Sequence, residues 1–139
     1  MKNLSKCCEK YGNVTMTILR VVIGAIFIAH GYQKFLAPAM AIGMTKGIGF
    51  PFPEFFGWAL ILSELIGGIL ILVGFLTRFV TPFLIFSMLV ALFTVHLSKG
   101  FITPGGYEYV LLLIASLLVL QANGAKLLSL DKLIFKGKV

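Results

Sequence analysis

Four long apolar stretches constrain the fold of this chain more than any other feature. They cover residues 14–36, 55–76, 82–97 and 107–121. A helix that crosses a bilayer needs ~20 apolar residues, with a range of ~17–25. The first two stretches meet this length, and the last two meet it when flanking residues are included. The sequence therefore predicts an all-α membrane protein, built as a bundle of four transmembrane helices.

Proline and glycine residues mark where these helices should begin and end. Pro38 follows the first stretch, and the segment 47–53 is rich in glycine and proline. Thr81 and Pro82 predict an N-cap and a first-turn proline for the third helix. Further breaks are expected at 104–106, a Pro-Gly-Gly turn, and at 123–124, an Asn-Gly C-cap.

The charges of the chain indicate how it is oriented in the membrane. Only 12% of the residues are charged, against about a quarter in soluble domains. The net charge is +7, but the sequence contains no basic stripe with interleaved aromatic residues. Nucleic acid is therefore not the expected partner. Most lysines and arginines lie on the side of the two termini, which predicts that both are cytoplasmic. Residues 14–122 would then form the transmembrane domain, with cytoplasmic tails at 1–13 and 123–139.

The two cysteines, Cys7 and Cys8, are adjacent in the N-terminal tail. No Cys-x-x-Cys occurs, so the sequence contains neither a dithiol redox motif nor a zinc spacing. We expect two reduced cytoplasmic thiols, with acylation or an intermolecular link as the alternatives.

Ionisable residues within the apolar stretches share helix faces with small residues. At ~100° per residue, Gly24, Gly31 and Lys34 lie on the same face as Arg20. Small residues let membrane helices approach closely, so these faces should point into the bundle. The same pattern joins Glu64 to Gly57, Gly67, Gly68 and Gly74 in the second stretch, and Glu108 to Ala115 and Ala122 in the fourth.

Depth along the helices places most of these residues in one half of the bundle. At ~1.5 Å per residue, His30 lies ~9 Å and Glu64 ~13 Å below the outer ends of their helices. Arg20 and Arg78 belong to the cytoplasmic half, where they are structural or lipid-facing charges that snorkel to the interface, or pair inward. The outer half contains the candidate ligand-binding residues His30, Lys34, Glu64, His96 and Glu108.

Glu64 is the residue that most strongly suggests a site. A carboxylate this deep in a membrane is costly unless it is neutral or paired, and such residues often mark functional sites. Lys34 has a similar depth and a long side chain, so we expect an ion pair. We predict a small cavity that opens to the outer side and is bordered by His30, Lys34, Glu64 and His96. The alternative is an ion pair that only fixes the helix register.

Haem and metal binding are the other chemistries that these residues suggest. Two histidines on different helices, His30 and His96, can in principle ligate a haem iron, but their depths differ. Glu64 and Glu108 would complete a metal site with suitable ligand types, yet no local spacing motif supports it. We therefore expect neither haem nor metal, and at this point the cofactor is left unknown.

Several segments of the chain resemble the DoxX family of small bacterial membrane proteins. They are LRVVIGAIFIAHGYQKF, ELIGGILILVGFLTR, VHLSKGF and GGYEYVLLLIASLLVL, which together extend from Leu19 to Leu120. The matching positions are Arg20, Gly24, His30, Gly31, Lys34, Glu64, Gly67, Gly68, Gly74, Arg78, His96, Glu108 and Tyr109. The resemblance implies a four-helix membrane protein linked to redox work, with a partner among membrane oxidoreductases.

Three functions are compatible with these sequence features. The first is a redox-associated membrane subunit whose outer cluster binds a polar or quinone-type ligand, with Lys34 and the histidines as donors and Glu64 as proton acceptor. The second is a non-enzymatic scaffold or assembly factor. The third is a transporter of a small solute, for which four short helices leave little room unless the protein forms oligomers.

Overall fold

The computed structural model describes the backbone of residues 2–134 and the side chains from residue 11 onward, and in this part of the chain all regular structure is helical. The side chains of Cys7 and Cys8, and the lysines of both extreme ends, lie outside the described residues. The elements are α1 (Lys2–Leu36), α2 (Pro38–Gly47), α3 (Pro53–Val73), α4 (Thr77–Ala91), a π-helix (Leu92–His96), a 3-10 turn (Leu97–Lys99), α5 (Glu108–Asn123) and α6 (Leu130–Ile134).

Three helical segments are long and apolar enough to cross a membrane. They are Tyr11–Leu36, Pro53–Val73 and Thr77–Lys99, and α5 is a shorter apolar helix. The prediction of an all-helical membrane protein is therefore confirmed. The count of four spans and the cytoplasmic position of both termini stay predictions.

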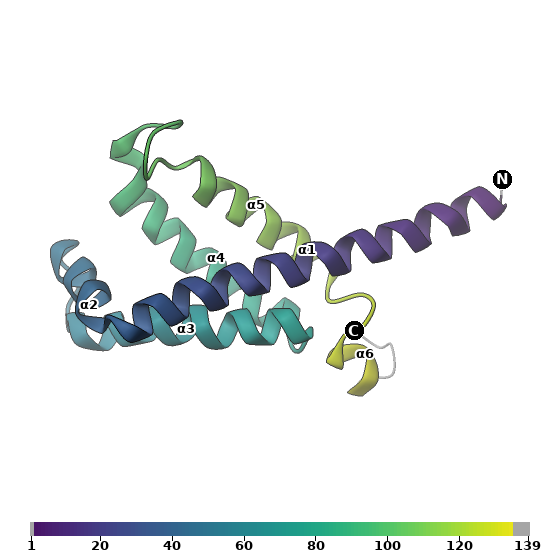
Figure 1. The fold of residues 1–139 in the computed structure, drawn as a ribbon, viewed down its shortest axis with the longest axis horizontal. Coiled ribbons are helices and arrows are strands. Elements are labelled where there is room, and N and C mark those ends of the chain that lie inside the picture. Colours follow the sequence, from purple (N-terminus) through teal and green to yellow (C-terminus); the bar gives the residue numbers. More distant parts are fainter. Residues whose placement is uncertain (1, 135–139) are drawn as a thin grey trace.

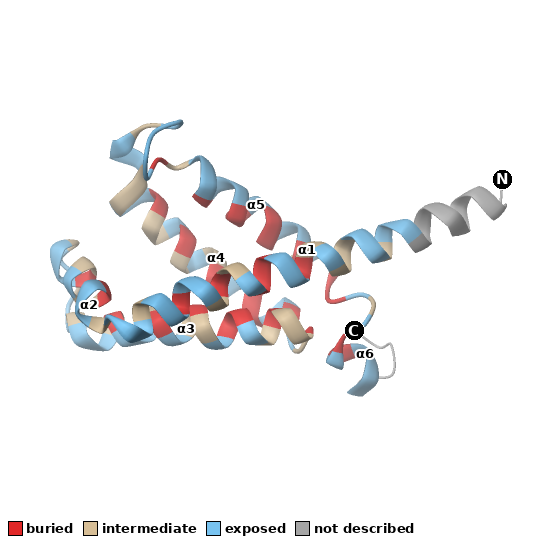
Figure 2. Ribbon diagram, in the orientation of Figure 1, coloured by how far each residue is buried: buried red, intermediate tan, exposed pale blue. Residues whose placement is uncertain are grey.

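The helices form two pairs that diverge toward one end. α1 packs along α3, and α4 packs along α5 (Figure 1). The two pairs separate toward the end that carries α2 and the loop after the 3-10 turn, while α6 lies near the other end of α3 (Figure 1). Buried residues follow the facing sides of the helices (Figure 2). The apolar core that they form includes Phe27, Ile71, Leu84 and Leu117.

Glycines allow α1 and α3 to pack almost backbone to backbone. A Cβ atom on Gly31 would lie 2.5 Å from the backbone nitrogen of Leu65, and one on Gly24 would lie 2.7 Å from that of Leu72. From the other side, a Cβ atom on Gly68 would lie 2.7 Å from the nitrogen of Ile28. The prediction that the glycine faces of the first two spans point into the bundle is thus confirmed.

The corresponding prediction for α5 is wrong. Glu108, Ala115 and Ala122 are exposed. Large side chains fill the space between α5 and its neighbours, so small residues do not mark its packing face. The buried residues of this helix are Val110, Leu113, Ile114, Ser116, Leu117 and Leu120.

Two helix starts also differ from the sequence prediction. α4 begins at Thr77 rather than at 81–82, and Pro82 lies inside it. The Thr81 hydroxyl donates to the Thr77 carbonyl oxygen at 3.0 Å and also contacts the Gln121 side chain, so it does not cap the helix. In the first loop, Pro38 begins the short helix α2 instead of only ending α1, because a proline suits the first turn of a helix.

The C-terminal segment explains why α4 starts early, since it supplies the missing cap. The Asp131 carboxylate accepts hydrogen bonds from the backbone N–H groups of Leu76 (2.8 Å) and Thr77 (3.3 Å). In return, the Asp131 N–H donates to the Gly74 carbonyl oxygen at 2.9 Å. A carboxylate at a helix N-terminus satisfies unpaired N–H groups and interacts well with the helix dipole.

Arg20 fastens the same segment to α1. Its side chain is only 1% exposed, and Nη2 donates to the carbonyl oxygens of Leu128 (2.8 Å) and Leu127 (3.4 Å). The prediction that Arg20 snorkels to the interface is therefore wrong, because segment 124–134 folds back and covers it. Arg78 is exposed, and its Nη2 donates to the Ala122 carbonyl oxygen at the end of α5 (3.3 Å).

Candidate functional site

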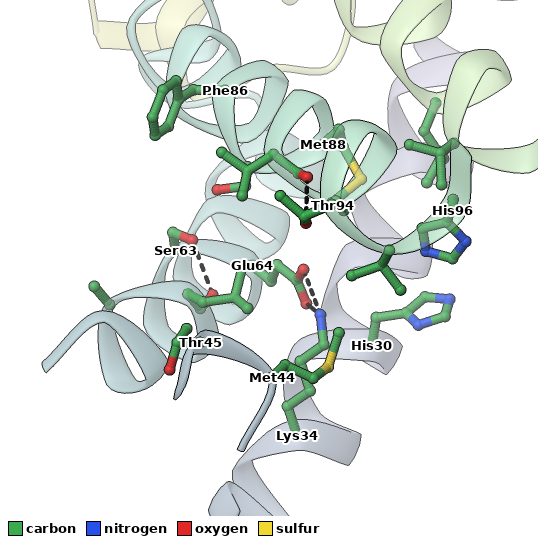
Figure 3. Close-up of a pocket in the computed structure, with 18 of the residues that line it drawn as sticks. His30, Lys34, Met44, Thr45, Ser63, Glu64, Phe86, Met88, Thr94 and His96 are labelled. Atoms are coloured by element: carbon green, nitrogen blue, oxygen red, sulfur yellow. Dashed lines mark hydrogen bonds and ion pairs between the residues drawn. The ribbon is translucent and has the colours of Figure 1, made fainter. Parts of the chain in front are cut away.

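A cavity of about 490 Å³ lies where the two helix pairs diverge. α1, α2, α3, α4 and the π-helix all contribute to its wall, and Tyr109 and its neighbours on α5 complete it. Four of the five candidate residues from the sequence line it, namely His30, Lys34, Glu64 and His96. Figure 3 shows these four side chains around the same space.

An ion pair between Lys34 and Glu64 lies at the wall of the cavity. The Lys34 Nζ atom lies 2.5 Å from both carboxylate oxygens of Glu64. The Glu64 side chain is 1% exposed and that of Lys34 is 20% exposed, so the lysine is the partner that reaches open space. The expected ion pair is confirmed, and it is the only salt bridge formed by the side chains that the structure describes.

The two histidines lie on the same side of the cavity (Figure 3). His96 Nδ1 lies 2.7 Å from the Gly105 carbonyl oxygen. A carbonyl oxygen only accepts hydrogen bonds, so Nδ1 carries the hydrogen of a neutral ring, and Nε2 is left as an acceptor. His30 Nε2 lies 3.4 Å from the Tyr109 hydroxyl, with the ring centroids 6.1 Å apart. His96 is therefore fixed by its backbone contact, whereas His30 is held only by a long hydrogen bond.

A π-helix carries His96 to the cavity. The segment Leu92–His96 continues α4 with a wider turn, and Thr94, Val95 and His96 all line the cavity. Short π segments inside α-helices are rare and occur often at functional sites. This feature was not predicted from the sequence, because hydropathy does not distinguish a π turn from an α turn.

The remainder of the wall is almost entirely apolar. Its few hydroxyl groups are already bonded to backbone carbonyls: Thr45 donates to Pro53 (2.7 Å), and Ser63 donates to Leu60 (2.9 Å). The unsatisfied polar capacity of the cavity is thus concentrated at the ion pair and the histidines. The apolar side chains of the wall include Phe27, Met44, Phe50, Phe56, Phe83, Phe86 and Met88.

The helix α2 also contributes to the site without having been predicted, since it supplies Met44 and Thr45 to the wall. Conversely, Glu108 is exposed and does not line the cavity, so the structure does not bring it together with the other four candidates. Within residues 11–134, no three His, Cys, Asp or Glu side chains are grouped closely enough to hold a metal ion.

This arrangement can bind a ligand with a flat apolar body and polar oxygens. The volume lies within the ~300–1,000 Å³ typical of small-molecule pockets, which combine apolar walls with a few convergent polar groups. Lys34 and a neutral histidine can donate hydrogen bonds to carbonyl oxygens. Glu64 can accept a proton, and Lys34 is placed to stabilise its charge.

Comparisons with known proteins are consistent with a small bacterial membrane protein. The family model for DoxX matches residues 15–97. The chain is 36% identical over 121 residues, 87% of each chain, to a Bacillus subtilis (strain 168) protein named "Putative oxidoreductase CatD". It is 32% identical to an uncharacterised protein of Haemophilus influenzae, over 94% of this chain and 92% of that one. It is also 31% identical to an uncharacterised membrane protein of Mycobacterium tuberculosis, over 69% and 58%. No solved structure matches.

Proposed function

Because this chain belongs to the DoxX family, we propose that it is the quinone-binding subunit of a redox system in the bacterial inner membrane. In this proposal the cavity takes the ring of the quinone, and a partner membrane oxidoreductase exchanges electrons with it. Both termini face the cytoplasm, and the cavity lies in the outer half of the bilayer. The name of the Bacillus subtilis relative supports a redox role.

The observation that carries the proposal is the combination of an apolar cavity with a single ion pair. Apolar walls favour a ligand that is dissolved in the membrane over a free ion or a sugar, since these would leave polar groups without partners. The exposed end of Lys34 and the ring N–H of a neutral His30 then provide donors for the carbonyl oxygens of a quinone ring, and the free Nε2 of the fixed His96 ring can accept a hydrogen bond from a quinol hydroxyl. A ligand of this kind satisfies both the apolar and the polar parts of the site.

The ion pair also suits the proton chemistry of a quinone. Reduction to the quinol takes up protons and electrons in equal number, and oxidation releases them. Glu64 is the carboxylate of the cavity, and Lys34 donates hydrogen bonds to both of its oxygens. A proton accepted by Glu64 would therefore weaken the ion pair between the two residues. In this scheme Lys34 orients the ring oxygen and Glu64 accepts one of the two protons of the quinol. The other proton is released at the outer side, and the partner oxidoreductase takes the two electrons.

A second candidate is a non-enzymatic scaffold. The observation that favours it is that Lys34 and Glu64 satisfy each other at 2.5 Å without any third group. In this case the pair fixes the packing of α1 on α3, and the protein serves as a membrane platform for its partner.

The amount of quinone bound to the purified protein distinguishes the quinone-binding subunit from the scaffold. We would purify the protein in mild detergent, extract it with organic solvent and quantify native quinones per chain. The wild type should retain quinone, whereas Glu64→Gln and Lys34→Met should lose most of it. Glu108→Gln and Lys46→Met are matched controls, because they make the same chemical changes at exposed positions outside the cavity. Equal quinone in all five proteins, or none in the wild type, would favour the scaffold.

A further inference from the structure

A second hollow, of about 360 Å³, lies beside the cavity on the lipid-facing surface of α3 and α4. Ser63 of α3 and Phe83 of α4 line both spaces, so the two are adjacent. From there the hollow follows the seam between the two helices as far as Leu70 and Leu76. We call this second space the seam groove.

The seam groove is lined by apolar side chains. Ser63 is its only polar lining residue, and the Ser63 hydroxyl is bonded to the Leu60 carbonyl oxygen. Gly67 lets α3 pack closely on α4 at its floor, because a Cβ atom there would lie only 3.2 Å from the Leu84 side chain. At the rim, the exposed rings of Phe79 and Phe83 lie 5.5 Å apart.

Polarity therefore changes between the cavity and the adjacent seam groove. The Lys34–Glu64 pair lies in the cavity, and the seam groove beyond Ser63 and Phe83 has no free polar group. From Ser63 to Leu70 the groove follows α3 for about 10 Å, at ~1.5 Å per residue. That length exceeds a methyl or methoxy substituent and suits a hydrocarbon chain.

We propose that the ligand of this protein is a chain-bearing amphiphile, with its polar ring in the cavity and an isoprenoid-type chain in the seam groove. This inference rests on the proposed function and specifies the class of quinone. The exposed rim gives the chain a lateral path from the bilayer, so the ring can enter while the chain stays in an apolar environment. Lipid tails are as apolar as the groove, so moving the chain from lipid into the groove gains little free energy. The polar contacts of the ring therefore determine the affinity, and the groove determines where the chain lies.

A photoaffinity probe tests this placement on the intact protein. The probe is a methylated benzoquinone with a decyl chain that ends in a diazirine. After irradiation of the protein in lipid nanodiscs, the labelled residues are mapped by mass spectrometry. The label should concentrate on the far part of the seam groove, at Leu70, Leu76 and Phe79, and excess benzoquinone without a chain should remove it.

The benzoquinone competitor distinguishes the proposed chain site in the seam groove from the proposed quinone site in the cavity. If it removes a label that maps to other lipid-facing residues, the seam groove is not the chain site, whereas the quinone site in the cavity stands. If the label is spread over the lipid-facing surface and resists the competitor, the probe behaves as a bulk lipid, and both proposals are overturned.

Two tryptophan variants add a control for the groove itself. Ile66 lines the seam groove, whereas Ile69, on the same helix, is exposed but lies outside it. Ile66→Trp should lose most of the label on Leu70 and Leu76, and Ile69→Trp should keep it. Equal labelling in both variants would contradict the assignment, and the mapping on the wild type does not depend on either variant.

Discussion

Removal of Lys34 should destabilise the protein, because it leaves a buried carboxylate without its cation. At an effective dielectric constant of ~20, unit charges 2.5 Å apart attract each other by about 7 kcal/mol, and desolvation offsets much of this. Glu64 is 1% exposed, so in Lys34→Met its carboxylate is buried and has no counter-charge. Breaking a buried pair in this way typically costs about 3–5 kcal/mol.

The expected loss of unfolding free energy in Lys34→Met is therefore about 3–4 kcal/mol. Glu64→Gln should cost less, about 2–3 kcal/mol, since the stranded lysine is 20% exposed and can be solvated from the cavity. The double variant should recover at least about 2 kcal/mol of the summed losses.

The assay is reversible unfolding in mixed micelles, followed by the fluorescence of Trp58, the single tryptophan of the chain. Lys46→Met and Glu108→Gln serve as controls, because both residues are exposed and should change the stability by less than about 0.5 kcal/mol. Strictly additive losses in the double variant would refute the ion-pair reasoning.

Three further predictions concern the C-terminal segment, the topology and the role of the cavity. Arg20→Lys should lose about 1–3 kcal/mol, because the shorter lysine side chain does not fill the buried position from which Nη2 reaches the carbonyl oxygens of Leu127 and Leu128, and limited proteolysis should then cut segment 124–134 faster. An impermeant thiol reagent should label a cysteine placed at the exposed Lys46 in intact cells but miss the native cysteines, and the reverse pattern would invert the orientation. In an oxidant-sensitive deletion strain, Glu64→Gln should fail to complement at normal abundance while Glu108→Gln succeeds, and full complementation by both would mean that the cavity pair has only a structural role.

The sequence was sufficient to predict the all-helical fold and the ion pair between Lys34 and Glu64. Glycines at helical spacing from Arg20 and Glu64 identified the faces on which α1 and α3 pack. An isolated carboxylate in an apolar stretch needs a partner, and Lys34 was the residue of matching depth. These predictions succeeded because each depends on one helix and on the cost of burying a charge.

Features that depend on several segments at once could not be predicted in the same way. Arg20 is covered by the segment 124–134, which is more than a hundred residues away in the sequence, so its burial had no local signal. Asp131, which caps α4, lies in a tail whose lysines suggested a solvated end. Likewise, the π-helix and α2 build the cavity wall through packing that apolar periodicity does not encode.

Whether the cavity is a quinone site can be decided by the binding of a short-chain benzoquinone to the purified protein in nanodiscs, measured by calorimetry after correction for partition into lipid. We expect saturable binding of one quinone per chain, about tenfold weaker in Lys34→Met, since a charged hydrogen bond is lost, and unchanged in Lys46→Met. Binding that does not saturate, or that is identical in the two variants, would contradict the assignment of the Lys34–Glu64 cavity as a quinone site.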